Sequence, residues 1–406
     1  MSIYKHKAVG GTLLVAGTAI GAGMLALPIT TGVAGFWPSI ALLAVVFVYM
    51  LWALFLLLEA NLYCHELEAN IITMARDRLG GIGQILAWFS FLLLMYSAAA
   101  AYSSAGGALI AKLLSGVTKF DITATNGVWL FAILFGLIVY FGTWLIDHIN
   151  RVLMIGLIGS YFVLAFFVTP HIEVKNLTVV QPIYLLSAVP IVLLSFTSHI
   201  ILPSLRTYLN NDIAQLKKIM WIGSSVPLIF YVVWQLVVTG VVPLKELAEI
   251  SQGGHPVAHL TDVLQADLHL NWIAVAVGAF SFFALVTSFL GVVLSLSDFL
   301  ADGFQVKRTR AGRAILVVMT IVPPLAFALL FPRGFVIALG YAGVFVAVLY
   351  GVLPPWMVWK ARYIEKLDAK FKVPGGKPAL VLTFLIGCAV IVFQIAATLG
   401  YLPTPS

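Results

Sequence analysis

The sequence predicts an all-α integral membrane protein, and three observations carry that prediction. The 406 residues are 62% hydrophobic and only 10% charged, against a charged fraction of about 25% in soluble domains. Apolar runs of about 20 residues recur along the chain, which is the length that crosses a hydrocarbon core about 30 Å thick. Lysine and arginine are concentrated in alternate connecting segments, as in multi-pass membrane proteins.

Eleven membrane-spanning helices are expected within one transmembrane domain that covers residues 1–406. In chain order they lie near 8–33, 36–60, 83–112, 126–145, 150–170, 182–206, 216–242, 271–300, 312–331, 334–358 and 378–401. The fourth and fifth are the least clearly separated. The polar stretch 61–82 mixes charged residues with Leu and Ile, which favours an amphipathic helix on the inner membrane surface.

The distribution of basic residues predicts the orientation of the chain. With a cytoplasmic N-terminus, 18 of the 23 basic residues fall in inner segments. These are Lys5, Lys7, Arg76, Arg78, Arg151, Arg206, Lys217, Lys218, Lys307, Arg308, Arg310, Arg313, Lys360, Arg362, Lys366, Lys370, Lys372 and Lys377. The other five are Lys112, Lys119, Lys175, Lys245 and Arg333. An odd number of spans then places the C-terminus in the periplasm. The net charge of +7 follows from the same bias, so no nucleic-acid partner is expected.

Residues 17–23, Gly-Thr-Ala-Ile-Gly-Ala-Gly, interrupt the first span. Each glycine costs a helix about 1 kcal/mol relative to alanine. Backbone groups freed within a bilayer need partners, so such a break persists only where it lines a cavity or binds a ligand. Secondary transporters use broken helices in this way and aim the N-termini of half-helices at anionic substrate groups. This segment therefore predicts a solute transporter.

The sixth span contains a second irregularity, Ser195 to Ser204 (SFTSHIILPS). Pro203 removes a backbone donor and clashes with the preceding turn. A simple proline kink is one interpretation. The break lies five spans after the first, however, as an inverted repeat of residues 8–170 and 182–358 predicts. The substrate site would then lie at mid-depth, where the two breaks meet, and the helix at 378–401 would lie outside the repeat.

With both breaks identified, the chain resembles the bacterial hydroxy and aromatic amino acid permeases, a branch of the amino acid–polyamine–organocation superfamily. It is most similar to the tyrosine-specific permeases. The matching stretches are Ala16–Pro28, Leu58–Asn61, Ser195–Phe196 with His199 and Pro203, Thr287–Val292, Asp298–Asp302, Phe331–Gly343 and Gly375–Pro378. The resemblance implies a leucine-transporter-type fold and proton-driven amino acid uptake across the inner membrane. Thr197 and Ile200 replace two glycines of the family pattern, and Ser198 replaces an aromatic residue, which bears on substrate preference.

The amides near Gly21–Gly23 are expected to face a substrate carboxylate, because a half-helix begins there with its positive dipole end. A tight helix crossing through small residues is the alternative. Thr18 and the carbonyls near Phe196 and Thr197 are candidates for the substrate ammonium, and Tyr96 or Tyr102 could support the carboxylate. The substrate-binding residues expected are Thr18, Gly21, Ala22, Gly23, Phe196, Thr197 and His199.

Four ionisable residues lie at or near membrane depth, where such groups are functional by default. His199 could bond a substrate hydroxyl, carry a coupling proton, or satisfy the broken backbone. Glu59, near the inner end of the second span, is either a solvated interfacial carboxylate or a coupling group. Asp298 and Asp302 end the eighth span and are interpreted as gate or loop contacts.

A sodium site is the sharper alternative to proton coupling. Ala284, Thr287 and Ser288 share one helix face at i, i+3 and i+4. With the carbonyls of Gly17 and Ile20 they would supply five oxygen ligands. Helix packing through small residues would explain the same pattern. No organic cofactor is expected.

These observations predict a proton-coupled aromatic amino acid importer that works by alternating access. Spans 1, 2, 6 and 7 would move against spans 3, 4, 8 and 9, with Phe196, Phe280 and Phe283 as apolar walls for the substrate. The alternatives are a sodium-coupled neutral amino acid transporter and an amino acid sensor without transport. An enzyme is not expected, because no nucleophile–base or metal motif is found. The expected partners are the amino acid and the lipid bilayer, with no obligate protein partner.

Overall fold

The computed structural model describes residues 2–403 except 65, 119, 269–270, 308 and 332–333. Lys119, Arg308 and Arg333 of the charge distribution therefore lie outside the described residues. Every regular element in the described part of the chain is helical, which confirms the predicted all-α class.

The helices follow one another in two runs. The first comprises α1 (Ser2–Ala19), α2 (Gly23–Thr31), η1 (Gly32–Ala34), α3 (Phe36–Leu62), α4 (Ile71–Thr118), α5 (Ala124–Phe141), α6 (Thr143–Val168), η2 (Thr169–His171) and α7 (Val174–Leu177). The second comprises η3 (Pro182–Tyr184), α8 (Leu185–Ser195), η4 (His199–Ile201), α9 (Leu202–Tyr208), α10 (Ile213–Val241), α11 (Leu244–Gln252), α12 (Pro256–Leu268), α13 (Asn271–Gly303), α14 (Arg310–Leu330), α15 (Gly334–Val346), η5 (Ala347–Val352), α16 (Leu353–Trp359), η6 (Lys360–Ile364) and α17 (Gly376–Thr398).

Within the described residues, ten segments are long and apolar enough to cross a membrane, and the bent pair α1–α2 makes eleven. Each predicted span overlaps one of them. The largest difference is at the third span, where α4 begins at Ile71 because the expected amphipathic helix joins it directly. Gly80, at φ 73° and ψ −156°, forms the bend between the two parts. A positive φ of this kind is accessible to glycine at little cost.

The first break lies between α1 and α2, whose axes differ by 51°. Close approach of neighbouring helices explains two of its glycines. A Cβ on Gly21 would overlap the hydroxyl of Ser288 on α13, and a Cβ on Gly23 would lie 2.9 Å from Ser195 Oγ on α8. The glycines therefore both weaken the helix and admit its neighbours.

The second break follows Ser195, where α8 ends, and residues 196–198 are not helical. Pro203 lies in the first turn of α9, where its missing N–H would have no helical partner in any case. The interpretation as a simple proline kink is therefore wrong, because the chain leaves helical geometry before the proline.

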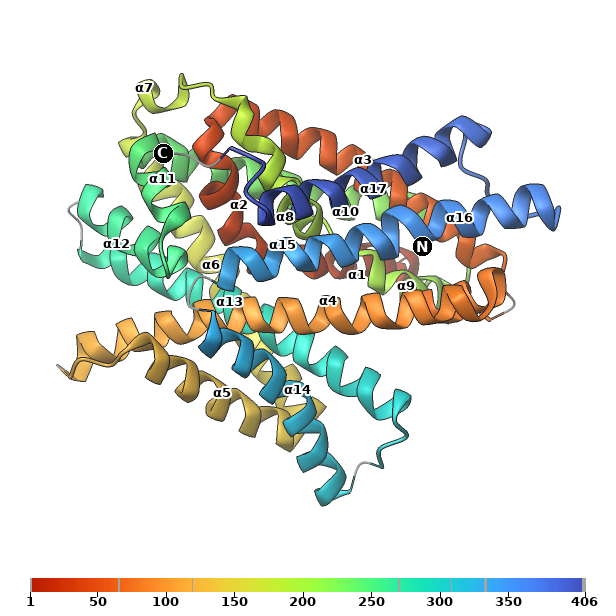
Figure 1. Ribbon diagram of the computed structural model, residues 1–406, viewed down its shortest axis with the longest axis horizontal. Coiled ribbons are helices and arrows are strands. Elements are labelled where there is room, and N and C mark those ends of the chain that lie inside the picture. Colours follow the sequence, from red (N-terminus) through yellow and green to blue (C-terminus); the bar gives the residue numbers. More distant parts are fainter. Residues whose placement is uncertain are drawn as a thin grey trace.

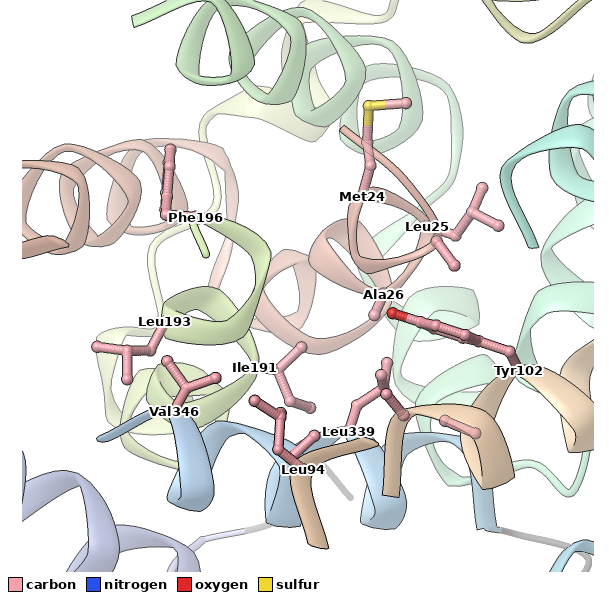
Figure 2. Packing of buried hydrophobic residues seen from close by; sticks show 14 of the residues in the cluster. Met24, Leu25, Ala26, Leu94, Tyr102, Ile191, Leu193, Phe196, Leu339 and Val346 are labelled. Atoms are coloured by element: carbon pink, nitrogen blue, oxygen red, sulfur yellow. The ribbon is translucent and has the colours of Figure 1, made fainter. Parts of the chain in front are cut away.

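The two broken helices occupy the centre of the bundle (Figure 1). α2 packs against α8, and α1 packs against α10. α4 runs between α15 on one side and α5 and α14 on the other. Figure 2 shows how residues of these elements meet in one buried cluster, including Ala26 of α2, Leu94 of α4, Ile191 of α8 and Leu339 of α15.

One end of the bundle, on the right in Figure 1, holds the end of α3, the beginning of α4 and the end of η6. Arginine side chains join these termini. Arg78 contacts Glu365, Arg206 contacts Asn61, and Arg362 contacts Glu59. We call this the basic end. α11 and α12 lie at the opposite end.

Candidate functional site

A cavity of about 490 Å³, here the central cavity, lies where the two helix breaks meet. Its wall includes residues 17–23 of the first break and Ser195, Thr197 and Ile200 of the second. α4, α6, α13 and η5 complete the wall. Pockets for small molecules commonly have volumes of about 300–1,000 Å³, so the space suits an amino acid.

The central cavity extends from the breaks toward the basic end. Along α13 its lining runs from Thr287 to Ser295, about 12 Å at the helical rise of 1.5 Å per residue. Along α1 it reaches Leu13, which is 65% exposed. On the other side of the breaks all residues of α2 are buried, and Tyr102 points toward Ala26 (Figure 2). The cavity is therefore open toward the basic end and closed toward the opposite end.

The N-terminus of α2 presents backbone amides to the central cavity. In the described part of the chain the amides of Gly21 and Gly23 have no hydrogen-bond partner, whereas the amide of Ala22 donates to Ser288 Oγ over 2.8 Å. Free amides at a helix N-terminus attract anions, because the helix dipole adds to their partial positive charge. The arrangement can hold a carboxylate beside Gly21 and Gly23.

The described lining of the central cavity contains no Asp, Glu, Lys or Arg. Its polar groups are hydroxyls and one carboxamide, that of Asn150, whose Oδ1 is buried without a partner among the described residues. An uncharged cavity with an amide-rich wall suits a zwitterion, since neither of its charges meets a fixed charge of like sign.

Tyr231 of α10 joins the two breaks. Its hydroxyl lies 2.7 Å from the carbonyl oxygen of Ala19 and 2.6 Å from that of Ser195. These carbonyls are among those left without helical partners at the ends of α1 and α8. Sequence reasoning missed Tyr231, because nothing in the apolar pattern of its span distinguishes it from a core tyrosine.

The two threonines predicted at the site line the central cavity, and each hydroxyl donates to its own helix. Thr18 Oγ1 donates to the carbonyl of Leu14 over 2.7 Å, and Thr197 Oγ1 donates to that of Leu193 over 3.3 Å. Each oxygen can still accept a hydrogen bond.

The candidate sodium ligands also gather at the central cavity. Gly17, Ile20, Thr287 and Ser288 line it. Thr287 Oγ1 lies 2.8 Å from the carbonyl of Phe283 and 3.2 Å from that of Ala284. Both hydroxyls of the predicted set therefore have protein partners, Ser288 through the amide of Ala22.

The predicted aromatic walls lie elsewhere. Phe196 packs edge-on against Tyr231 at 5.1 Å, Phe280 packs against Trp234 at 4.8 Å, and Phe283 covers Gly156. None of the three lines the central cavity.

The aromatic residues in the described lining are Tyr102 and Tyr350. Of the two tyrosines considered for the carboxylate, Tyr102 faces the cavity, whereas the hydroxyl of Tyr96 donates to the carbonyl of Met319 over 2.8 Å.

His199 lies beside the central cavity rather than in its lining. The side chain is buried, and its ring stacks on Tyr350 with centroids 4.5 Å apart. Tyr350 in turn lines the cavity. It belongs to the π-helical turn η5, and such turns often mark functional sites. Neither Tyr350 nor Asn150 was predicted, because their positions depend on packing between distant segments.

Glu59 is fully buried and held by four hydrogen bonds. Arg362 donates to both carboxylate oxygens. Tyr63 Oη donates over 2.9 Å, and the backbone amide of Val373 donates over 2.7 Å. The interpretation as a solvated interfacial carboxylate is therefore wrong. Of the two aspartates at the end of α13, Asp298 lines a separate space of about 210 Å³ with Arg313.

The fold matches that of a solved transporter, MhsT in complex with L-phenylalanine. The two structures agree with a TM-score of 0.65 over 96% of this chain and 98% of that chain, at 15% identity. The chain thus has the leucine-transporter-type fold that was predicted. This fold, with a cavity at its two broken helices, is that of a multi-pass membrane protein.

Residues 4–394 match the tryptophan/tyrosine permease family, and the chain belongs to this family. It is 38% identical to tyrosine-specific transport system 1 of Haemophilus influenzae, over 98% of this chain and 99% of that protein. It is 34% identical to tyrosine-specific transport system 2 of the same organism, over 99% of each. A tryptophan-specific transport protein of that organism is also 34% identical, over 97% and 96%. The predicted family is confirmed, and the protein is a transport protein rather than an enzyme.

Proposed function

We propose that this protein is a proton-coupled symporter that imports an aromatic amino acid by alternating access across the bacterial inner membrane, with tyrosine as its preferred substrate. The observation that carries the proposal is the uncharged central cavity at the two breaks, with the unpartnered amides of Gly21 and Gly23 in its wall.

The substrate is proposed to bind with its carboxylate at these amides. Its ammonium group would donate to Thr18 Oγ1 and to the carbonyls near Phe196 and Thr197. The apolar part of the described lining, including Leu94, Met95 and Tyr350, would receive the aromatic ring. An aromatic substrate would gain from contact with the ring of Tyr350.

The choice of tyrosine rests on the relatives. Two relatives named tyrosine-specific are 38% and 34% identical to this chain, and those named tryptophan-specific are 34%, 32% and 30% identical. The L-phenylalanine in the MhsT complex supports the same chemical class.

The distribution of basic residues supports a cytoplasmic N-terminus and a periplasmic C-terminus. The basic end then faces the cytoplasm, and the central cavity as described is open inward. Residues 8–170 and 182–358 are proposed to form the two halves of an inverted repeat, between which the site becomes accessible to one side at a time.

Of the two coupling candidates, His199 is favoured over Glu59. Glu59 is bound by Arg362, and removing its charge would leave a buried guanidinium without a partner. Sodium coupling is the second candidate, because Gly17, Ile20, Thr287 and Ser288 lie together on the central cavity.

The test is uptake of labelled tyrosine into sodium-free proteoliposomes, with and without an inward proton gradient. The proposal expects accumulation above equilibrium only with the gradient. Accumulation that appears only when external sodium is supplied would assign coupling to the Thr287–Ser288 region. Competition by excess unlabelled tyrosine, tryptophan and phenylalanine ranks the substrates, and a tryptophan rank above tyrosine would contradict the choice of substrate.

A further inference from the structure

A second space, here the side cavity, lies beside the central cavity and has a volume of about 110 Å³. Asn70, at the start of α4, forms part of its wall and is exposed at the basic end. His199, at the second helix break, also forms part of the wall and is 1% exposed. The side cavity therefore connects a residue at the basic end with the buried imidazole.

The imidazole of His199 forms no well-aligned hydrogen bond with another group in the described chain. The backbone of Met50 lies beside the ring, but neither ring nitrogen has a hydrogen bond within the described chain. Buried polar atoms are almost always paired, either with protein groups or with water. The side cavity is large enough for several water molecules, since one needs about 10–15 Å³ of such space. Water in the side cavity is thus the natural partner of His199.

The surroundings of His199 contain few other titratable groups. Apart from the imidazole itself, Tyr350 is the one such group in the described lining of the side cavity. A small space that also borders His199 is lined by residues of α1, α3, α10 and the second break, and it contains no charged side chain among the described residues.

Several charged groups on the neighbouring elements have hydrogen-bond partners. On α3, Glu59 is bound by Arg362 of η6, and on α9, Arg206 is bound by Asn61 and Asn211. On α4, Arg78 is bound by Glu365. On α1, Lys7 donates to the carbonyl of Tyr208. Among the described residues, no Asp, Glu, Lys or Arg lines either of the two spaces that border His199.

Tyr350 and Ile200 separate the two cavities, because each lines both of them. The ring of Tyr350 is inclined by only 26° to that of His199. A protonated imidazole in this position would gain from the electron-rich face of the phenol ring. Close contact between Gly351 and Gly387 of α17 fixes the backbone next to Tyr350.

We propose that His199 is the site that carries the coupling proton, and that the side cavity is its own hydrated route to the basic end, separate from the path of the substrate. The proton binds a lone pair of the imidazole to give imidazolium, and is returned to water in the side cavity near Asn70. Because Tyr350 stacks on His199 and lines the central cavity, a change in the charge of His199 acts on the central cavity through Tyr350. This inference rests on the proposed proton symport.

Two variants and one control test the route. His199→Gln keeps a polar side chain but cannot titrate, and Ile72→Trp fills the side cavity from α4. The matched control is Ile85→Trp, at a 60% exposed position of the same helix. For each, tyrosine exchange without a gradient is compared with gradient-driven accumulation, and a pH dye inside the vesicles records the proton flux.

We expect exchange within about twofold of the unmodified protein for Ile72→Trp and Ile85→Trp. His199→Gln should lose accumulation entirely, Ile72→Trp should slow proton entry at least fivefold, and Ile85→Trp should change neither. If gradient-driven accumulation persists in His199→Gln, His199 is not the proton site. The proposed symport then still holds, because the unmodified protein accumulates tyrosine. Normal proton flux in Ile72→Trp overturns the route. An unmodified protein that exchanges tyrosine but shows no gradient-driven accumulation removes both the symport and this inference.

Discussion

The hydroxyl of Ser288 on α13 accepts a hydrogen bond of 2.8 Å from the amide of Ala22, the residue between Gly21 and Gly23 at the start of α2. One side chain of the eighth span thus holds the N-terminus of the half-helix that forms the amide wall of the central cavity. The contact is so close that a Cβ added to Gly21 would overlap Ser288 Oγ. The same added Cβ would lie 3.5 Å from Ser288 Cβ.

This geometry predicts a rescue. Gly21→Ala should reduce tyrosine uptake by at least tenfold, because the new methyl group and the Ser288 hydroxyl cannot occupy the same space. Gly21→Ala combined with Ser288→Ala should recover much of that loss, since only an ordinary van der Waals contact of 3.5 Å remains. Ser288→Ala alone should lower the free energy of unfolding by about 1 kcal/mol, the net contribution of one hydrogen bond.

Initial uptake rates of the three variants, measured in proteoliposomes at equal protein density, give a double-mutant cycle. Ser295→Ala, in the lining of the same cavity, is the matched control for loss of a hydroxyl. Purely additive losses in the double variant would contradict the proposed overlap.

Tyr231→Phe should uncouple the two breaks while leaving the fold intact. The variant leaves the carbonyls of Ala19 and Ser195 without the hydroxyl between them, at a cost of about 1–3 kcal/mol. Because the lost contacts join the two breaks, we expect this free energy to destabilise the transport-competent conformation. Uptake should then drop about tenfold, since 1.4 kcal/mol corresponds to a factor of ten.

Tyr161→Phe is the control for Tyr231→Phe, because its hydroxyl donates over 3.1 Å to the carbonyl of Phe230, which lies inside α10 and not at either break. We expect similar melting temperatures for the two variants and an uptake defect only in Tyr231→Phe. Equal uptake in both would show that Tyr231 acts as an ordinary core residue.

Glu59→Gln should destabilise the protein by about 3–5 kcal/mol, because it leaves the guanidinium of Arg362 buried without a counter-charge. Replacing both residues, as Glu59→Gln with Arg362→Gln, should restore part of this loss. The measurement is unfolding in mixed micelles with increasing denaturing detergent. Asp368→Asn breaks an ion pair whose aspartate side chain is 92% exposed, and it should leave the transition unchanged. A stable Glu59→Gln protein that has lost gradient-driven accumulation would instead favour a coupling role for Glu59.

The parts of this structure that were predictable from sequence depend on local chemistry. The glycines at positions 17, 21 and 23 predict the first break, since the effect of glycine on a helix does not depend on the rest of the fold. The spans follow from the thickness of the bilayer. The expected third span, 83–112, lies in the part of α4 that follows Gly80, where the backbone leaves helical geometry.

The parts that sequence reasoning missed depend on contacts between distant segments. Glu59 and Arg362 are 303 residues apart, so neither residue indicates that the other will neutralise it. Tyr231 meets the two breaks only after α10 packs against α1. His199 faces the side cavity because residues 199–201 form a 3₁₀ turn, whose side-chain directions differ from those of an α-helix.

The pH dependence of stability should contain a contribution from His255, which lies between α11 and α12, outside the membrane-spanning segments. Its Nδ1 is buried without a partner among the described residues, and burial lowers its pKa below the usual range. In the unfolded chain the imidazole has a pKa of about 6.5, so the unfolded state binds the proton more readily. Stability should therefore decrease as the pH falls through about 6.5 toward the lower pKa of the folded state.

His255→Gln should reduce the slope of stability against pH in this range. Melting temperatures between pH 7.5 and 5 should fall less steeply in the variant than in the unmodified protein, because the replacement does not titrate. His171→Gln, at an exposed position, is the control and should retain the original slope. α11 packs against α2, and α12 packs against α13, so a charge on His255 would act on the elements that close the central cavity at this end. Identical slopes in all three proteins would show that His255 does not titrate differently in the folded and unfolded states.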